Sequence, residues 1–252
     1  MLKIEKTVLP SPEQWEIIIE GMRNPMNSWA KSDSYTCTGN GDTDQDCPKC
    51  HLFEDEHDGC TTFCHNHEDV PVFLLGENDH KLMMQLAKGG PVHAKYRRMI
   101  PVMFTVTAPT FWWIEFDTYK VGTVRNSCSK MHKIHVEPFS LDNFSHEGLD
   151  EVPEAFDVLE AVIVALEYLR KKFNQTQEKR YWRALIELLP HGYNMKATIF
   201  LTYEVLSNIH HGRRHHKVVE WHTFCDWIEQ LPYSEIITGG DSSWQSTRET
   251  SR

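Results

Sequence analysis

FTVTAPTFWWIEFDTYKVGTVRNSCSK, the stretch from Phe104 to Lys130, decides the fold. Its first residues belong to the run VMFTVT at 102–107, which predicts a strand because β-branched side chains pack well on a pleated surface. An Ala-Pro-Thr-Phe turn and an aromatic helical segment follow, and the residues after Thr118 are mainly polar and cationic. The stretch therefore predicts a strand, a turn, a helix and a polar loop in that order.

Segments with helical periodicity lie on both sides of this stretch. Ser11 as N-cap and Pro12 at the first helical position predict a helix over residues 11–22. Further helices are expected over residues 79–88, 154–173, 177–189, 196–210 and 217–230, the last two as an antiparallel pair around Gly212. We expect an α+β protein with one domain over residues 1–240 and a flexible tail over 241–252.

The net charge of −10 is concentrated in one segment. Between Asp33 and Asp69, seven Asp and three Glu stand against the single Lys49, a net of −9, which leaves about −1 for the rest of the chain. Nucleic acid and anionic membranes are not expected as partners, because both bind basic faces. No apolar run approaches the roughly 20 residues of a membrane span. The first residues also lack the features of a signal peptide, so we expect a soluble cytoplasmic protein.

The same acidic segment contains five of the seven cysteines within 28 residues. Two thiolate pairs on a short loop are typical of a tetrahedral structural zinc site, and metal binding would supply the folding energy that an acidic, apolar-poor segment lacks. We therefore expect a zinc-binding insertion over residues 33–69. The alternatives are other ligands (Cys37, His51, His65 or His67) or an acidic loop with reactive thiols; a disulfide framework is less favoured. The expected zinc ligands are Cys47, Cys50, Cys60 and Cys64.

A second informative stretch, LPHGYNMKATIFLTYEVLSNIHHGRR, runs from Leu189 to Arg214. Together the two stretches resemble the flavin-dependent thymidylate synthases, the ThyX family. The second stretch places a family asparagine on Asn208 and a family arginine on Arg213, and Val219–Ile228 resembles the family's closing helix. The family motif Arg-His-Arg-x-x-Ser-x-x-x-x-Ser-x-Arg falls without gaps on Thr118, Tyr119, Lys120, Thr123, Cys128 and Lys130.

The resemblance implies an antiparallel sheet flanked by helices, FAD as cofactor, and methylation of dUMP to dTMP. Methylenetetrahydrofolate and NADPH would be co-substrates, and the protein would be a homotetramer. The implied catalytic residues are Arg213, Lys130 and Cys128. The implied cofactor-binding residues are Thr118, Tyr119, Lys120, Thr123 and Asn208, and the implied substrate-binding residues are Glu115, Arg125, Ser127, Ser129 and Arg213.

Several alternatives stay open at this point. The cations and hydroxyls over residues 118–133 suit a phosphate-binding loop but also a solvated turn. Cys128 is either a nucleophile or a buried small residue. The protein could also be a catalytically altered relative that binds a nucleotide or a protein partner, and the acidity of the insertion disfavours a nucleic-acid-binding zinc protein. An aromatic run could stack on a flavin or pterin ring or form core: Phe111, Trp112, Trp113 and Phe116.

Overall fold

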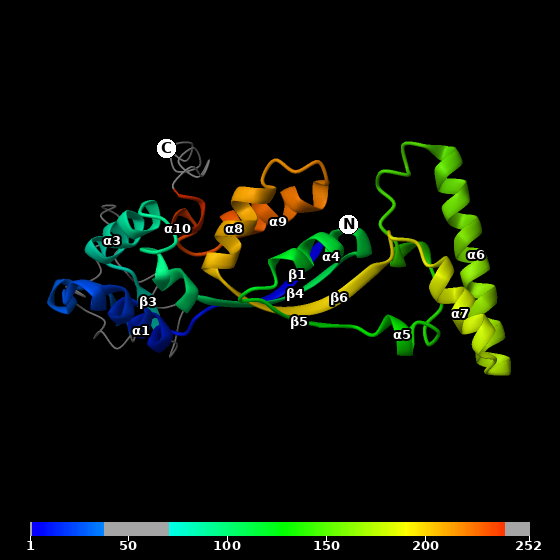
Figure 1. Cartoon of the computed structure of the whole chain (residues 1–252), viewed down its shortest axis with the longest axis horizontal. Coiled ribbons are helices and arrows are strands. Elements are labelled where there is room, and N and C mark those ends of the chain that lie inside the picture. The colour runs from blue at the N-terminus through cyan, green and yellow to red at the C-terminus, as the bar shows by residue number, and fades with distance from the viewer. Residues whose placement is uncertain (1, 38–70, 240–252) are drawn as a thin grey trace, which may run out of the picture. The chain divides into compact units, whose positions relative to one another are not determined.

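The computed structural model describes residues 2–37 and 71–239 of the chain (Figure 1). The described residues divide into two units, one of residues 2–9 and 101–239 and the other of residues 10–37 and 71–100. Residues 241–252 and most of the 33–69 insertion lie outside the described residues, and the single domain over 1–240 stays a prediction.

The larger unit is built on a four-stranded sheet in the order β1-β4-β6-β5, with every neighbouring pair antiparallel. The prediction of an α+β fold with an antiparallel sheet is confirmed. The expected strand over 102–107 is part of β4, the central strand. The strands are β1 (Lys3–Val8), β4 (Pro101–Pro109), β5 (Val124–Ser127) and β6 (Asn194–Thr202).

The expected helix over residues 196–210 is wrong in its first half, which is strand β6. Alternate side chains of β6 are buried, including Ala197, Ile199 and Leu201, so the apolar period is two rather than 3.6. A short apolar run fits either period, and pairing along the whole of β4 selects the strand. Helix α8 (Tyr203–Arg213) therefore begins later and includes Gly212, and residues 214–218 lead to α9 (Val219–Glu229).

Helices α4 (Thr110–Phe116), α8 and α9 lie over one face of the sheet (Figure 1). The aromatic run of α4 forms the core beneath them, since Trp112, Trp113 and Phe116 are all buried. The Trp113 indole N–H donates to the carbonyls of Ala108 (3.0 Å) and Met195 (3.1 Å), which ties α4 to both central strands. The core interpretation of these three rings is confirmed, and Phe111 is half-buried.

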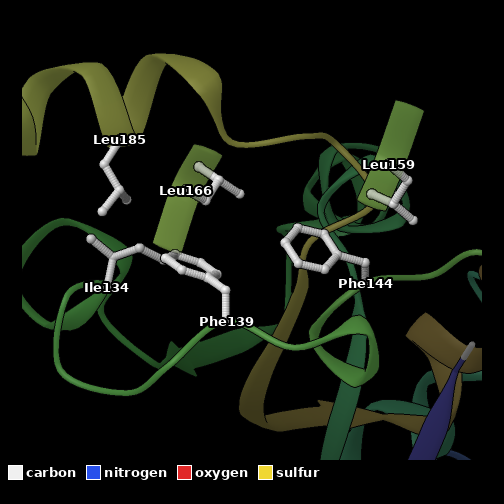
Figure 2. Packing of buried hydrophobic residues seen from close by; sticks show 6 residues of the cluster. All are labelled: Ile134, Phe139, Phe144, Leu159, Leu166 and Leu185. Atoms are coloured by element: carbon white, nitrogen blue, oxygen red, sulfur yellow. The ribbon is translucent and has the colours of Figure 1, made fainter. Parts of the chain in front are cut away.

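At one end of this unit, the helices α6 (Pro153–Thr176) and α7 (Lys179–Leu188) lie side by side (Figure 1). They confirm the helices predicted over residues 154–173 and 177–189. They pack with the loop that follows α5 (Lys130–Lys133) around a separate hydrophobic cluster. Figure 2 shows its buried members pointing toward one another: Ile134, Phe139, Phe144, Leu159, Leu166 and Leu185.

The carboxylate of Glu167 joins this loop to α6. It accepts two hydrogen bonds of 2.7 Å from Arg170 and one of 3.2 Å from the backbone N–H of Phe139. These bonds, chiefly that from Arg170, outweigh burial and lower the pKa of Glu167 to about 2. A lowered pKa in the folded state stabilises the protein above the ordinary glutamate range, and this contribution disappears as the pH falls toward the folded value.

We therefore expect Glu167→Gln to lower the melting temperature at pH 7. The difference from wild type should shrink between pH 4.5, the usual glutamate pKa, and pH 2, because the wild-type carboxyl becomes neutral over that range. Melting curves of both proteins at several pH values measure this difference. A difference in melting temperature that stays constant from pH 4.5 to pH 2 would contradict a stabilising role for the ionised carboxylate.

The smaller unit contains two helices and a two-stranded antiparallel sheet. Ser11 caps the first helix with a capping box to Gln14, and Pro12 is its first residue, which confirms the prediction. The buried pair Arg23 and Asp79 joins this helix to the second one. The elements are α1 (Pro12–Arg23), α3 (Glu77–Lys88), β2 (Tyr35–Cys37) and β3 (Val72–Leu74).

Short helical turns complete the described parts of both units. None of the helices in residues 2–37 and 71–239 has the length and apolarity needed to cross a membrane. The short turns are η1 (Asn24–Met26), η2 (Trp29–Lys31), η3 (Lys95–Met99), η4 (Asp117–Tyr119), η5 (Leu141–Asn143) and α10 (Glu235–Thr238).

Candidate nucleotide-binding site

Arg213, in the last turn of α8, is the centre of a polar cluster on the helical face of the sheet. Its Nη1 lies 2.7 Å from Oε2 of Glu115 at the end of α4, and its Nε donates to the Tyr119 hydroxyl at 3.0 Å. The guanidinium also lies over the ring of Trp221, 4.9 Å from its centroid. The fold thus brings together three of the predicted site residues, Glu115, Tyr119 and Arg213.

The carboxylate of Glu115 is the anchor of this group. Besides Arg213, it accepts a hydrogen bond from the Trp221 indole N–H at 3.0 Å and lies 3.3 Å from Nε2 of His216. We call Glu115, Tyr119, Arg213, His216 and Trp221 the arginine cluster. Trp221 was not predicted as a site residue, because in the sequence it is one apolar position among several in the VEWHTFCDWI helix.

The arginine cluster fixes a cation while leaving it accessible. The Arg213 side chain is 18% exposed and that of Glu115 is 34% exposed. Bonds to Glu115 and Tyr119 use two of the five N–H donors of a guanidinium, and the others can take a phosphate or a carbonyl oxygen. The Glu115 carboxylate and the Trp221 ring already orient the Arg213 side chain. Arg213 would therefore lose less conformational entropy when it binds a ligand.

The turn after the short helix η4 presents a second set of groups suited to an anion. Lys120 is exposed, and Gly122 has a positive φ of 80°, which lets the backbone turn sharply. The Thr123 hydroxyl oxygen is buried and has no hydrogen-bond partner among the described residues. A cation and an orphan hydroxyl in one tight turn are groups that a phosphate can use.

Thr118 and Tyr119, two of the predicted cofactor-binding residues, both form hydrogen bonds within the protein. The Thr118 hydroxyl donates to the backbone carbonyl of Glu115 at 2.7 Å, and the Tyr119 hydroxyl accepts from Arg213. A cofactor that used both hydroxyls would have to compete with these bonds.

The remaining predicted residues are not hydrogen-bonded or ion-paired to Arg213 in the parts of the chain described. Arg125, on β5, lies 3.1 Å from Asp117 and stacks over the Trp113 ring at 4.8 Å. Ser129 caps the short helix α5, accepting from the His132 N–H at 3.1 Å. Ser127 and Asn208 are exposed and Lys130 is half-buried.

Cys128 lies just beyond the end of β5. Its backbone N–H donates to the Lys196 carbonyl at 2.8 Å, and its side chain is an exposed free thiol. The alternative that it is a buried small residue is therefore wrong. Its role as a nucleophile stays a prediction.

The predicted zinc ligands Cys47, Cys50, Cys60 and Cys64 lie outside the described residues. Within residues 2–37 and 71–239, no group of three or more His, Cys, Asp or Glu side chains could hold a metal ion.

No protein-family model matches this chain, and no curated protein does. Among solved structures, it is similar to thymidylate synthase X (ThyX) from Helicobacter pylori with FAD and dUMP, with a TM-score of 0.58 and 14% identity over 96% of this chain and 98% of that one. A second structure of the flavin-dependent thymidylate synthase ThyX from Helicobacter pylori, complexed with FAD and dUMP, gives a TM-score of 0.57 and 14% identity over 95% and 98%. At this identity the likeness shows the fold alone: the chain has a ThyX-like fold.

Proposed function

We propose that this protein is a flavin-dependent methyltransferase acting on a pyrimidine deoxynucleotide, most simply converting dUMP to dTMP with methylenetetrahydrofolate and NADPH as co-substrates. The observation that carries the proposal is Arg213, held by Glu115 and Tyr119 over the Trp221 ring in a ThyX-like fold. An oriented, partly exposed guanidinium suits a nucleotide, because it can grip a phosphate or a uracil carbonyl with two parallel bonds.

Arg213 would bind the nucleotide and stabilise negative charge that develops on the uracil ring. Lys120 and Thr123 would hold the phosphates of FAD through the ammonium and the orphan hydroxyl. Bound FAD would supply the hydride that reduces the transferred carbon. The other proposed nucleotide-facing groups are Arg125, Ser127, Cys128, Ser129 and Lys130, and Asn208 is proposed for the cofactor.

We also propose assembly into a homotetramer. One cross-strand row on the sheet supports subunit contacts, because four exposed apolar side chains lie next to one another on adjacent strands. The row consists of Val8, Met103, Phe200 and Val124.

The absorbance spectrum of the purified protein tests the proposal. Oxidised flavin typically absorbs at about 450 nm. Such a band, if it shifts when dUMP is added, would support the proposal. A colourless protein that takes up neither FAD nor dUMP would overturn it. Binding of dUMP without FAD would instead favour a catalytically altered relative, an alternative supported by the internal bonds of Thr118 and Tyr119.

Glu115 is expected to weaken the attraction between Arg213 and an anionic nucleotide. In Glu115→Gln an acceptor for Arg213 remains, but the negative charge is removed. We expect dUMP to bind about five- to ten-fold more tightly at low salt, since one charge about 4 Å away contributes about 1 kcal/mol in a water-like dielectric, and Glu115 is partly exposed to solvent. Titration calorimetry at two salt concentrations measures this.

Asp226→Asn is the matched control for this change. Asp226 also pairs with an arginine, Arg214, but stands outside the arginine cluster. It should leave dUMP affinity unchanged. Weaker binding by Glu115→Gln would show that the carboxylate serves the nucleotide directly.

The cysteine insertion is proposed to hold one structural zinc ion. We expect about one zinc per chain in purified protein, because four thiolates complete a tetrahedral site. Cys47→Ser should lose the metal, whereas Cys225→Ser, at a buried thiol of α9, should keep it. Zinc contents measured by atomic emission that are equal in wild type and Cys47→Ser would contradict the ligand assignment.

A further inference from the structure

The 24-residue helix α6 also carries exposed apolar side chains outside the face that packs in the protein. Leu159 and Leu166 point into the hydrophobic cluster shared with α7 (Figure 2). Outside that face, Val158 is 62%, Val164 70% and Tyr168 56% exposed. A surface helix normally carries one apolar stripe, and a second exposed one indicates a contact with another molecule.

Val158 and Tyr168 belong to a regular seam along the helix, whose members are exposed except for the half-buried Ala165 and Lys172. Each follows the previous one by four or three residues in alternation, which is the spacing of a coiled-coil contact surface. We call this set the α6 seam: Glu154, Val158, Ala161, Ala165, Tyr168 and Lys172.

The α6 seam is complementary to itself in the antiparallel direction. It begins with an acid and ends with a base, and its two central residues are alanines. Consider a second copy of the helix that runs antiparallel to the first, with the twofold axis between Ala161 and Ala165. Glu154 of each copy then faces Lys172 of the other copy, one such pair at each end of the contact. The alanines then allow the backbones to approach closely, and the two helix dipoles oppose each other favourably.

Lys172 is already oriented toward such a contact. Its Nζ lies 5.7 Å from the centroid of the Tyr168 ring, one turn earlier on the same seam. In a parallel pair, Glu154 would instead face another Glu154 and Lys172 another Lys172, which is repulsive at both ends. The charge pattern therefore favours a second copy of this chain in the antiparallel orientation.

We propose that α6 packs antiparallel against α6 of a second copy through the α6 seam and so forms a twofold subunit contact. This inference assigns the contact to one surface and does not depend on binding of flavin or nucleotide. Its failure would leave the proposed function in place, and a colourless protein would leave this contact in place.

Charge reversal tests the contact on the full-length protein, with the molar mass in solution measured by light scattering. Glu154→Lys and Lys172→Glu should each halve the mass of the assembly, because each places like charges together at both ends of the pair. The double variant Glu154→Lys with Lys172→Glu should restore the wild-type mass. Restoration by the double variant also shows that the single variants did not fail by misfolding.

Glu160→Lys is the matched control, because Glu160 is exposed on the same helix but lies off the seam. It should leave the mass unchanged. The proposal would be overturned by a monomeric wild type, by single reversals that keep the wild-type mass, or by a double variant that stays at half mass.

Discussion

Replacing Arg213 by alanine is expected to weaken dUMP binding by about 100-fold. Loss of a pair of charge-assisted hydrogen bonds costs about 2.7 kcal/mol, which corresponds to that factor. Glu115 would lose its main partner, but it is 34% exposed and keeps the Trp221 N–H, so solvent and that bond limit any loss of stability. Titration of dUMP into the flavin-loaded protein, followed by the shift of the flavin band, measures the affinity.

Arg214→Ala is the matched control for this prediction. Arg214 is the next residue in the chain, but its guanidinium pairs with Asp226 and Glu229 rather than with the arginine cluster. We expect nearly wild-type dUMP binding for this variant. Arg213→Lys should fall between the two, since lysine keeps the charge but lacks the planar fork. Equal losses in Arg213→Ala and Arg214→Ala would show that general positive charge, and not the oriented guanidinium, binds the nucleotide.

Replacing Asp79 by asparagine should destabilise the smaller unit by about 3–5 kcal/mol, the usual cost of breaking a buried ion pair from one side. The side chains of Asp79 and Arg23 are 0% and 4% exposed. The Asp79 carboxylate also accepts hydrogen bonds of 2.7 Å from the hydroxyls of Ser32 and Ser34. Without the carboxylate charge, the Arg23 guanidinium would remain buried opposite a neutral amide.

This contribution has a defined pH dependence. Burial opposes ionisation of Asp79, but the bonds from Ser34, Ser32 and Arg23 outweigh it and lower its pKa below the ordinary value. A lowered pKa in the folded state means that the stabilisation is present at neutral pH and is lost as the pH falls through the folded value. Hydrogen exchange of residues 10–37 and 71–100 measures the stability of this unit directly.

Glu187→Gln serves as the comparison for Asp79→Asn. Glu187 pairs with Arg183 on α7, but both side chains are largely exposed, and exposed pairs contribute little. We expect its exchange rates and melting temperature to match the wild type. If Asp79→Asn behaved in the same way, the buried pair would have no net role in holding α1 to α3.

The sequence by itself determined the elements whose evidence is local. The capped start of α1, the long periodicity of α6 and the β-branched run of β4 each depend on neighbouring residues, so their predictions hold. The order of elements over Phe104–Lys130 and Leu189–Arg214 was also sufficient to reveal the ThyX-like fold.

Only the tertiary structure decided which period residues 194–202 adopt and what surrounds Arg213. The apolar run of β6 suits a helix or a strand, and a β4 strand more than 90 residues earlier selects the strand by pairing with it. Arg213 and Glu115 are 98 residues apart in sequence, and Trp221 joins them from a third helix. Such contacts leave no local pattern, because side chains distant in the chain meet only when the sheet and its covering helices have packed.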